Sequence, residues 1–180
     1  MAYVESANRD DEAQRMTTSP AGGESAAFRQ AMREFAAGVA IVACGAGEAR
    51  SGATVTALTS LSLSPPTLLV CLSLDALTLK RLRETGAFSV NLLGDRHRAL
   101  ADRFANRGIR GADRFADGTW APLFTGAPLL ADALAAIDCR VEEIIERHTH
   151  AIVIGAVVGM RRGPGGAALV LWRSAYETLE

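Results

Sequence analysis

The stretch GVAIVACGAGEARSGATVTALTSLSLSPPTLLVCLSL, residues 38–74, decides the fold class. It opens with the apolar run Val39–Cys44, and Gly45–Gly47 then begins a hairpin turn. Thr54–Thr56 resumes as a strand with alternating faces, and a Pro-Pro pair breaks the chain before the apolar run Thr67–Leu74. Apolar, β-branched runs separated by turn residues are typical of strands. The stretch therefore predicts strands that follow one another as hairpins.

The rest of the chain repeats this pattern with few helices. Phe28, Met32 and Phe35 recur at helical spacing between Ser25 and Gly38, which predicts an amphipathic helix. Two shorter helices are expected at 77–83 and 99–104, further strands at 88–93, 137–145, 150–160 and 167–172, and irregular chain at 106–131. This order favours a mainly β, antiparallel barrel with flanking helices over a doubly wound parallel sheet. We expect residues 1–24 to form a flexible tail and residues 25–180 to form a single domain.

Composition excludes some functions. The net charge is −1, so nothing suggests the basic face that nucleic acid requires. No apolar stretch reaches the roughly 18 residues of a membrane span, and the polar, acidic N-terminus does not look like a signal peptide. Cys44, Cys71 and Cys139 are far apart and lie in apolar runs, which predicts reduced thiols and a cytoplasmic location.

Ready-made catalytic and metal motifs are absent from the sequence. No GxGxxG leads from a strand into a helix, and GxxxxGK[ST], HExxH and GxSxG do not occur. His148 and His150 would share one face of a strand, but no third metal ligand stands near them. We therefore expect no metal site.

Hydroxyl side chains are concentrated between Gly52 and Pro66, a segment without Asp, Glu, Lys or Cys. Hydroxyls and backbone N–H groups in a curved loop make neutral hydrogen bonds to a phosphate or to a polar ring edge. From the residues alone, a ligand-binding bend and a Ser/Thr-rich loop without a special purpose both remain open.

A series of short motifs resembles the short-chain flavin reductase family, the reductase components of two-component flavin monooxygenases. The motifs are GVAIV (38–42), GATVTALTSLS (52–62), PP (65–66), FSVNLL (88–93), RFA (103–105), DRF (113–115) and LWRSAY (171–176), and the resemblance covers about residues 26–180. It implies a split β-barrel of the FMN-binding type, a homodimer, and NADH or NADPH as hydride donor to FAD or FMN. It also implies a partner monooxygenase that takes the reduced flavin.

The resemblance implies flavin contacts at matching positions. Residues Thr54, Thr56, Ala57 and Leu58 would line the isoalloxazine, mainly through backbone groups, with Thr59 and Ser60 nearer the ribityl chain and phosphate. The remaining contacts would be Ser73, Thr78 and Lys80 or Arg81 near the phosphate, Asn91 behind the site, and Arg173 and Tyr176 closing it. For Asn91 a purely structural amide is an equal alternative, and packing is an alternative for Arg173 and Tyr176.

The nicotinamide side is expected at His150. Many members of the family carry Gly-Asp-His five residues before a glycine, whereas here His148 and Thr149 precede His150, with Gly155 following. The hydride chemistry belongs to the two nucleotides, so no catalytic side chain is expected. The alternatives are a flavin-binding or electron-transfer protein without turnover, a pyridoxine-phosphate-type oxidase, and a structural barrel. Neither FAD against FMN nor NADH against NADPH is settled by the sequence.

Overall fold

The computed structural model describes residues 24–180, which divide into two units. The first unit ends at Phe35 and contains helix α2 (Glu24–Met32); the second comprises Ala36–Glu180. The predicted N-terminal helix is confirmed, although it ends at Met32 instead of near Gly38. The expected tail, apart from Glu24, lies outside the described residues, and a domain that starts at 25 stays a prediction.

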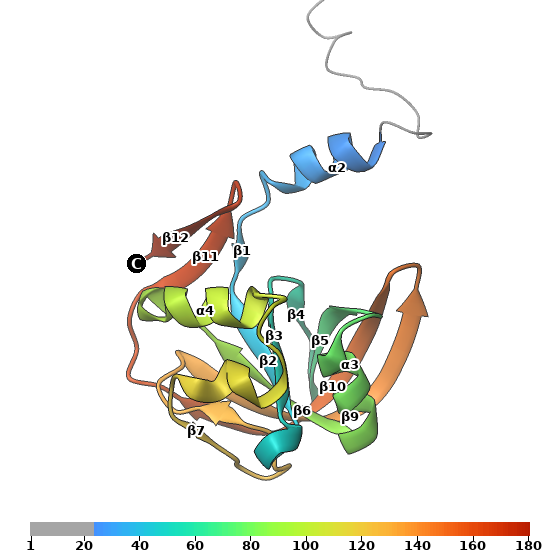
Figure 1. Cartoon of the computed structure of the whole chain (residues 1–180), viewed down its shortest axis with the longest axis vertical. Coiled ribbons are helices and arrows are strands. Elements are labelled where there is room, and N and C mark those ends of the chain that lie inside the picture. The colour runs from blue at the N-terminus through green and yellow to red at the C-terminus, as the bar shows by residue number, and fades with distance from the viewer. Residues whose placement is uncertain (1–23) are drawn as a thin grey trace, which may run out of the picture. The chain divides into compact units, whose positions relative to one another are not determined.

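Strands make up about half of the second unit (Figure 1). They are β1 (Ala37–Gly38), β2 (Ala40–Cys44), β3 (Ser51–Val55), β4 (Leu58–Leu63), β5 (Pro66–Ser73), β6 (Ala87–Leu92), β7 (Trp120–Ala121), β8 (Leu129–Leu130), β9 (Ala135–Arg147), β10 (His150–Arg162), β11 (Ala168–Trp172) and β12 (Ala175–Leu179). The helices are α3 (Leu77–Thr85), α4 (Arg98–Ala105) and the 3₁₀ turns η1 (Gly47–Ala49), η2 (Asp95–His97) and η3 (Gly111–Ala116). No helix within residues 24–180 has the length and apolar character needed to cross a membrane.

Seven strands form the main sheet, in the order β3-β2-β6-β9-β10-β5-β4. Every neighbouring pair is antiparallel. Strands β1, β11 and β12 form a second, three-stranded sheet, and β7 pairs with β8. The predicted class, mainly antiparallel β with flanking helices, is confirmed.

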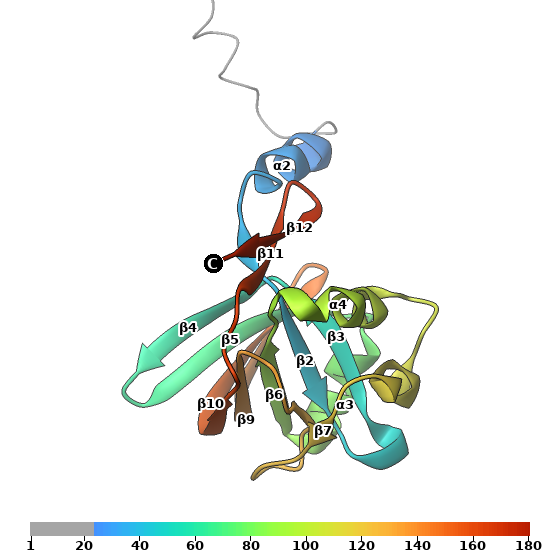
Figure 2. The same ribbon diagram turned by 90° about the vertical axis from the view of Figure 1, so that its left-hand side faces the viewer.

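The main sheet has to curl, because β3 and β4 are its two opposite edges and yet follow each other in the chain. Only Thr56 and Ala57 separate the last residue of β3 from the first of β4. Three extended residue steps span about 11 Å at most, so the two edges must approach each other at this crossing. In Figure 2 the β4–β5 hairpin extends to the left, away from β2 and β3. This curled but open sheet is the split-barrel arrangement that the resemblance implies.

Both faces of the sheet are buried where β2 runs through it. Alternate side chains of a strand point to opposite faces. Ala40, Val42 and Cys44 belong to one apolar cluster, which includes Leu79 and Leu82 of α3. Val39, Ile41 and Ala43 belong to a second cluster, which includes Phe104 of α4, Phe115 of η3 and Leu169 of β11. A strand buried on both faces explains the uninterrupted apolar run of this part of the sequence.

Two expectations for the backbone are corrected by the structure. The Ser/Thr-rich segment after Ala57 is the edge strand β4 and not a curved loop, so the bend itself consists of Thr56 and Ala57. The region 106–131 is less irregular than expected, since it contains η3, β7 and β8.

Candidate functional site

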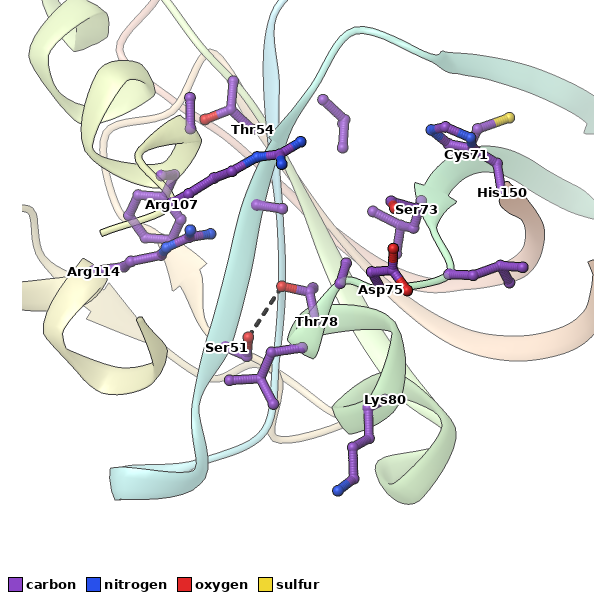
Figure 3. A pocket seen from close by; sticks show the side chains of 18 of the residues that line it. Ser51, Thr54, Cys71, Ser73, Asp75, Thr78, Lys80, Arg107, Arg114 and His150 are labelled. Atoms are coloured by element: carbon purple, nitrogen blue, oxygen red, sulfur yellow. Dashed lines mark hydrogen bonds between the residues drawn. The ribbon is translucent and has the colours of Figure 1, made fainter. Parts of the chain in front are cut away.

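A cavity of about 930 Å³ opens beside the crossing from β3 to β4. This volume lies within the usual range for small-molecule sites. One wall consists of β3 and the chain that follows α4, and the other of β5, the start of α3 and the tip of the β9–β10 hairpin (Figure 3). Its lining contains Ser51, Ala53, Thr54, Val55, Thr56, Ala57, Cys71, Leu72, Ser73, Leu74, Asp75, Ala76, Leu77, Thr78, Lys80, Phe104, Ala105, Arg107, Arg110, Gly111, Arg114 and His150.

The bend at Thr56 and Ala57 lines this cavity. The Thr56 carbonyl accepts from Leu58 N–H at 3.1 Å, and the Ala57 carbonyl accepts from Cys71 N–H at 3.0 Å. These two bonds hold the bend against β5. The N–H groups of Thr56 and Ala57 donate to no backbone carbonyl among residues 24–180. They are therefore available to a ligand with acceptor atoms along its edge.

Three of the hydroxyl side chains that line the cavity already have partners within the protein. Thr54 donates to the Ala101 carbonyl at 2.7 Å and so holds α4 against β3. The hydroxyls of Ser51 and Thr78 lie 3.0 Å apart and are buried, and the Thr78 carbonyl accepts from the Cys44 thiol. The hydroxyls of Thr54 and Thr78 thus contribute to the positions of α4 and α3.

The start of α3 forms the anion-attracting part of the right-hand wall in Figure 3. Leu79 and Lys80 donate their N–H groups to Ala76, which leaves the N–H groups at the very start of the helix without a partner inside it. Lys80 lines the cavity and forms no ion pair with the described carboxylates. Helix N-termini and a nearby cation suit a phosphate group.

The hairpin tip between β9 and β10 brings His150 to the cavity rim. His150 is the register partner of Ser73, and Leu74 N–H donates to the Thr149 carbonyl at 3.0 Å. The Thr149 hydroxyl lies 2.8 Å from Nδ1 of His150. His148, at the turn, has a φ of 53°, a left-handed conformation that favours glycine. The family's Gly-Asp is thus replaced by a strained histidine and by a neutral hydroxyl.

Seven of the predicted contact residues line the cavity together, namely Thr54, Thr56, Ala57, Ser73, Thr78, Lys80 and His150. The structure brings them together from β3, β5, α3 and β10. These are the positions that the resemblance assigned to the flavin ring, the phosphate and the nicotinamide side.

The other predicted residues do not line the cavity, and their contact with a flavin stays a prediction. Leu58, Thr59 and Ser60 belong to β4, where Thr59 donates to the Ser60 carbonyl. Asn91 is buried, and its amide bonds to Ile41, Ser89 and Leu130. It is therefore the structural amide that the alternative described.

Arg173 and Tyr176 belong to the β11–β12 hairpin and line no part of the cavity. The Arg173 guanidinium stacks 4.4 Å from the Trp172 ring centre. Burial, the charge of Asp102 and a hydrogen bond to that carboxylate raise the pKa of Tyr176. Both side chains therefore have contacts within the chain, and their role in closing the site stays a prediction.

Several residues that line the cavity were not among the predicted site residues. Arg107 and Arg114 lie opposite His150, and Asp75 lies on the His150 side (Figure 3). Arg110 lines the same cavity. The regular recurrence of arginine after α4 was the one available signal, but that segment was expected to be irregular. Residues 24–180 contain no group of three or more His, Cys, Asp or Glu that could hold a metal ion.

Comparison with known proteins agrees with this architecture. The flavin reductase like domain family matches residues 32–180. The chain is 38% identical over 164 residues to FMN reductase (NADH) RutF of Agrobacterium fabrum, which covers 91% of this chain and 94% of the relative.

Two solved structures show the same fold. BorF, the flavin reductase component of a bacterial two-component tryptophan halogenase, has a TM-score of 0.80 with 33% identity, covering 87% of this chain and 98% of BorF. The NADH:FAD oxidoreductase SgcE6 of Streptomyces globisporus C-1027, solved with NAD and FAD fragments, has a TM-score of 0.80 with 27% identity, covering 91% of this chain and 98% of SgcE6. This chain belongs to the flavin reductase like domain family.

Proposed function

We propose that this chain is an NAD(P)H-dependent flavin reductase that reduces FMN or FAD in the cavity beside the β3–β4 crossing. The observation that carries the proposal is the composition of that cavity. Backbone N–H donors at Thr56 and Ala57, a helix start with Lys80, and His150 at the rim all surround one space. The relative from Agrobacterium fabrum is named an NADH-dependent FMN reductase, which supports the same activity here.

The residues present fit a flavin. The free N–H groups of the bend suit the acceptor atoms along the polar edge of an isoalloxazine, and they would stabilise negative charge there. The start of α3 and Lys80 suit the phosphate. The nicotinamide and the flavin supply the hydride chemistry when both are bound. The chain orients the two nucleotides and needs no side-chain nucleophile.

We assign His150 to the nicotinamide side of the site. It stands at the cavity rim on the opposite wall from Thr54 (Figure 3), and Thr149 engages Nδ1 of its ring. This leaves Nε2 as the ring atom with which His150 meets a nucleotide.

A homodimer and a partner monooxygenase belong to the same proposal. The register places Leu69 beside Ile154 and Cys71 beside Ile152, on one half-exposed face of β5 and β10. Leu61 and Leu63 of the edge strand β4 are exposed as well. An apolar face next to the cavity suits a second copy of the chain. BorF serves a two-component halogenase, which supports a role in supplying reduced flavin. The unpaired cysteines suit a cytoplasmic enzyme.

The test mixes purified protein with NADH or NADPH and with FMN or FAD, and follows the loss of the visible flavin absorbance in a stopped-flow instrument. Multiple turnovers of free flavin are expected with at least one pair. Tight flavin binding without bleaching by either nicotinamide would contradict the proposal and favour a binding or electron-transfer protein. Light scattering of the same sample, with a mass of twice the chain expected, tests the dimer.

A further inference from the structure

The chain that leaves α4 and runs into η3 places arginines along one wall of the cavity. We call residues 106–114 the arginine arm. Arg107, Arg110 and Arg114 of this arm all line the cavity, and Figure 3 shows Arg107 and Arg114. The proposed flavin contacts at Lys80 and α3 lie on the other wall, so the arm is a second cationic region of the same space.

Arg114 braces the arm. Its guanidinium donates to the carbonyls of Ile109 and Asn106, each at 2.7 Å, and to the Gly52 carbonyl of β3. The Asn106 side chain accepts from Gly108 N–H at 2.8 Å. These bonds tie an otherwise irregular segment to the sheet. The arm is therefore held in place before any ligand arrives, which lowers the entropic cost of binding.

Arg107 and Arg110 are exposed and form no ion pair with the described residues, and Asp113 is the one carboxylate of the arm itself. The neighbouring Asp117 is engaged by Arg103 at 2.7 Å. Burial and the positive charge of Arg110 lower the pKa of Arg114, as expected for like charges held close together. The cavity as a whole is lined by four cationic side chains and by one carboxylate, that of Asp75.

We infer that Arg107 and Arg110 bind a phosphate of a nucleotide held in the cavity, as an anion site separate from Lys80 and the start of α3. This inference rests on the proposed function. Guanidinium groups match phosphate oxygens with paired hydrogen bonds, and two of them without carboxylate partners leave their donors free for this purpose. The shared chemistry is a phosphate ester or diphosphate. Its source is either the tail of the flavin or the diphosphate of the nicotinamide donor.

The test compares Arg107→Gln, Arg110→Gln and the double variant with Arg162→Gln. Arg162 is an exposed arginine of β10 that lines no part of the cavity, so this control removes the same charge elsewhere. Flavin affinity is measured by fluorescence quenching with FMN and with riboflavin, which lacks the phosphate. The apparent KM is measured with NADH and with N-benzyl-dihydronicotinamide, which lacks the diphosphate.

The double variant is expected to bind one phosphate-bearing ligand about tenfold or more weakly, because charge-assisted hydrogen bonds are lost. A weaker FMN affinity with unchanged riboflavin affinity assigns the arm to the flavin tail. A higher KM for NADH with an unchanged KM for the benzyl donor assigns it to the nicotinamide nucleotide. High salt should lower the affinity of the wild type for the same ligand and have less effect on the affinity of the variant.

Two results would overturn the inference: no difference between the double variant and Arg162→Gln with either ligand, or equal losses with and without the phosphate. Failure of the proposed function is a separate outcome. In that case the wild type would reduce no flavin with any donor, while the comparison of FMN with riboflavin binding would still report on the arm.

Discussion

The hydroxyl of Thr149 lies 2.8 Å from Nδ1 of His150, at the rim of the cavity. The carbonyl of the same threonine accepts from Leu74 N–H, which ties the hairpin tip to the loop leading into α3. Thr149 thus fixes both the backbone that carries His150 and the rotation of its imidazole. In the family pattern this place belongs to a carboxylate, and here a neutral group performs the orientation.

Removal of this hydroxyl should affect the nicotinamide more than the flavin. We expect Thr149→Val to raise the apparent KM for NADH several-fold, because a hydrogen bond of about 1 kcal/mol orients the ring. Thr149→Ser keeps the hydroxyl and should stay near the wild type. Steady-state kinetics at saturating FMN, together with FMN titration, measure both effects. If the serine variant is as impaired as the valine variant, the hydroxyl does not orient the ring.

The imidazole of His150 should itself contribute to the binding of NADH. His150→Ala is expected to raise the KM for NADH, with a smaller change in kcat and in FMN affinity. His148→Ala serves as the control, because it removes a neighbouring imidazole from the turn and leaves His150 in place. Equal effects of the two substitutions on KM would show that His150 has no special contact with the donor.

His148 carries the strain of the turn. Its φ of 53° places a β-carbon close to the following carbonyl, at a cost of about 1–2 kcal/mol. His148→Gly should relieve this strain, less the greater freedom that glycine has in the unfolded chain. We expect a net gain of about 0.5–1 kcal/mol and a melting temperature higher by about 1–4 °C. Thermal unfolding measures it. A lower melting temperature than that of His148→Ala would contradict the prediction.

Gly155 is required by the packing beneath β10. A β-carbon at this position would lie 2.5 Å from the Phe88 ring and 3.2 Å from the β-carbon of Cys139, both of them buried. Gly155→Ala should therefore destabilise the fold by about 1–3 kcal/mol. Adding Phe88→Leu should recover part of the loss, because the ring is the nearer obstacle. Urea unfolding of the four chains in this cycle gives the coupling energy, and strictly additive effects would exclude this contact as the cause.

The three thiols should differ in reactivity. Burial raises the pKa of Cys44 to about 12 and that of Cys139 to about 12. Since the thiolate is the reactive form, both should resist alkylation at pH 8 in the folded protein. Cys71 is half-exposed in the single chain and borders the proposed dimer face, but it also lines the cavity, through which a reagent reaches it. It should therefore be the first of the three thiols to react, and bound FMN should slow its modification. Mass spectrometry after iodoacetamide treatment identifies the modified residues. Modification of Cys44 before Cys71 in folded protein would contradict this order.

The sequence predicted the strands that have apolar runs but not those that lack them. Strand β2 is buried on both faces, so its sequence is an uninterrupted apolar run that indicates a strand. Strand β4 was mistaken for a loop because its serines and threonines are exposed at the edge of the sheet, where hydrogen bonds to β5 and not burial define the strand. Strand β12 was missed for the same reason, since four of its five residues are exposed.

The cavity residues that the resemblance named lie on strands, at the bend and in α3, whereas those that the sequence did not indicate lie in irregular chain. His150 was named from its place five residues before Gly155, and the strand register sets it beside Ser73. Asn91 was assigned to the site, although the partners of its amide are backbone and side-chain groups that no local pattern reveals. Arg107 and Arg110 reach the cavity because Arg114 ties their loop to Gly52, a contact between residues far apart in the chain. Such tertiary contacts leave no periodic signal in the sequence.

The most direct measurement is a crystal structure of the protein soaked with FMN at a concentration that saturates binding in solution. We predict an isoalloxazine against the backbone of residues 54–57, with the phosphate at the start of α3 or at the arginine arm and His150 on the open side of the ring. A flavin bound elsewhere on the chain, or this cavity empty under saturating FMN, would contradict the assignment of the site.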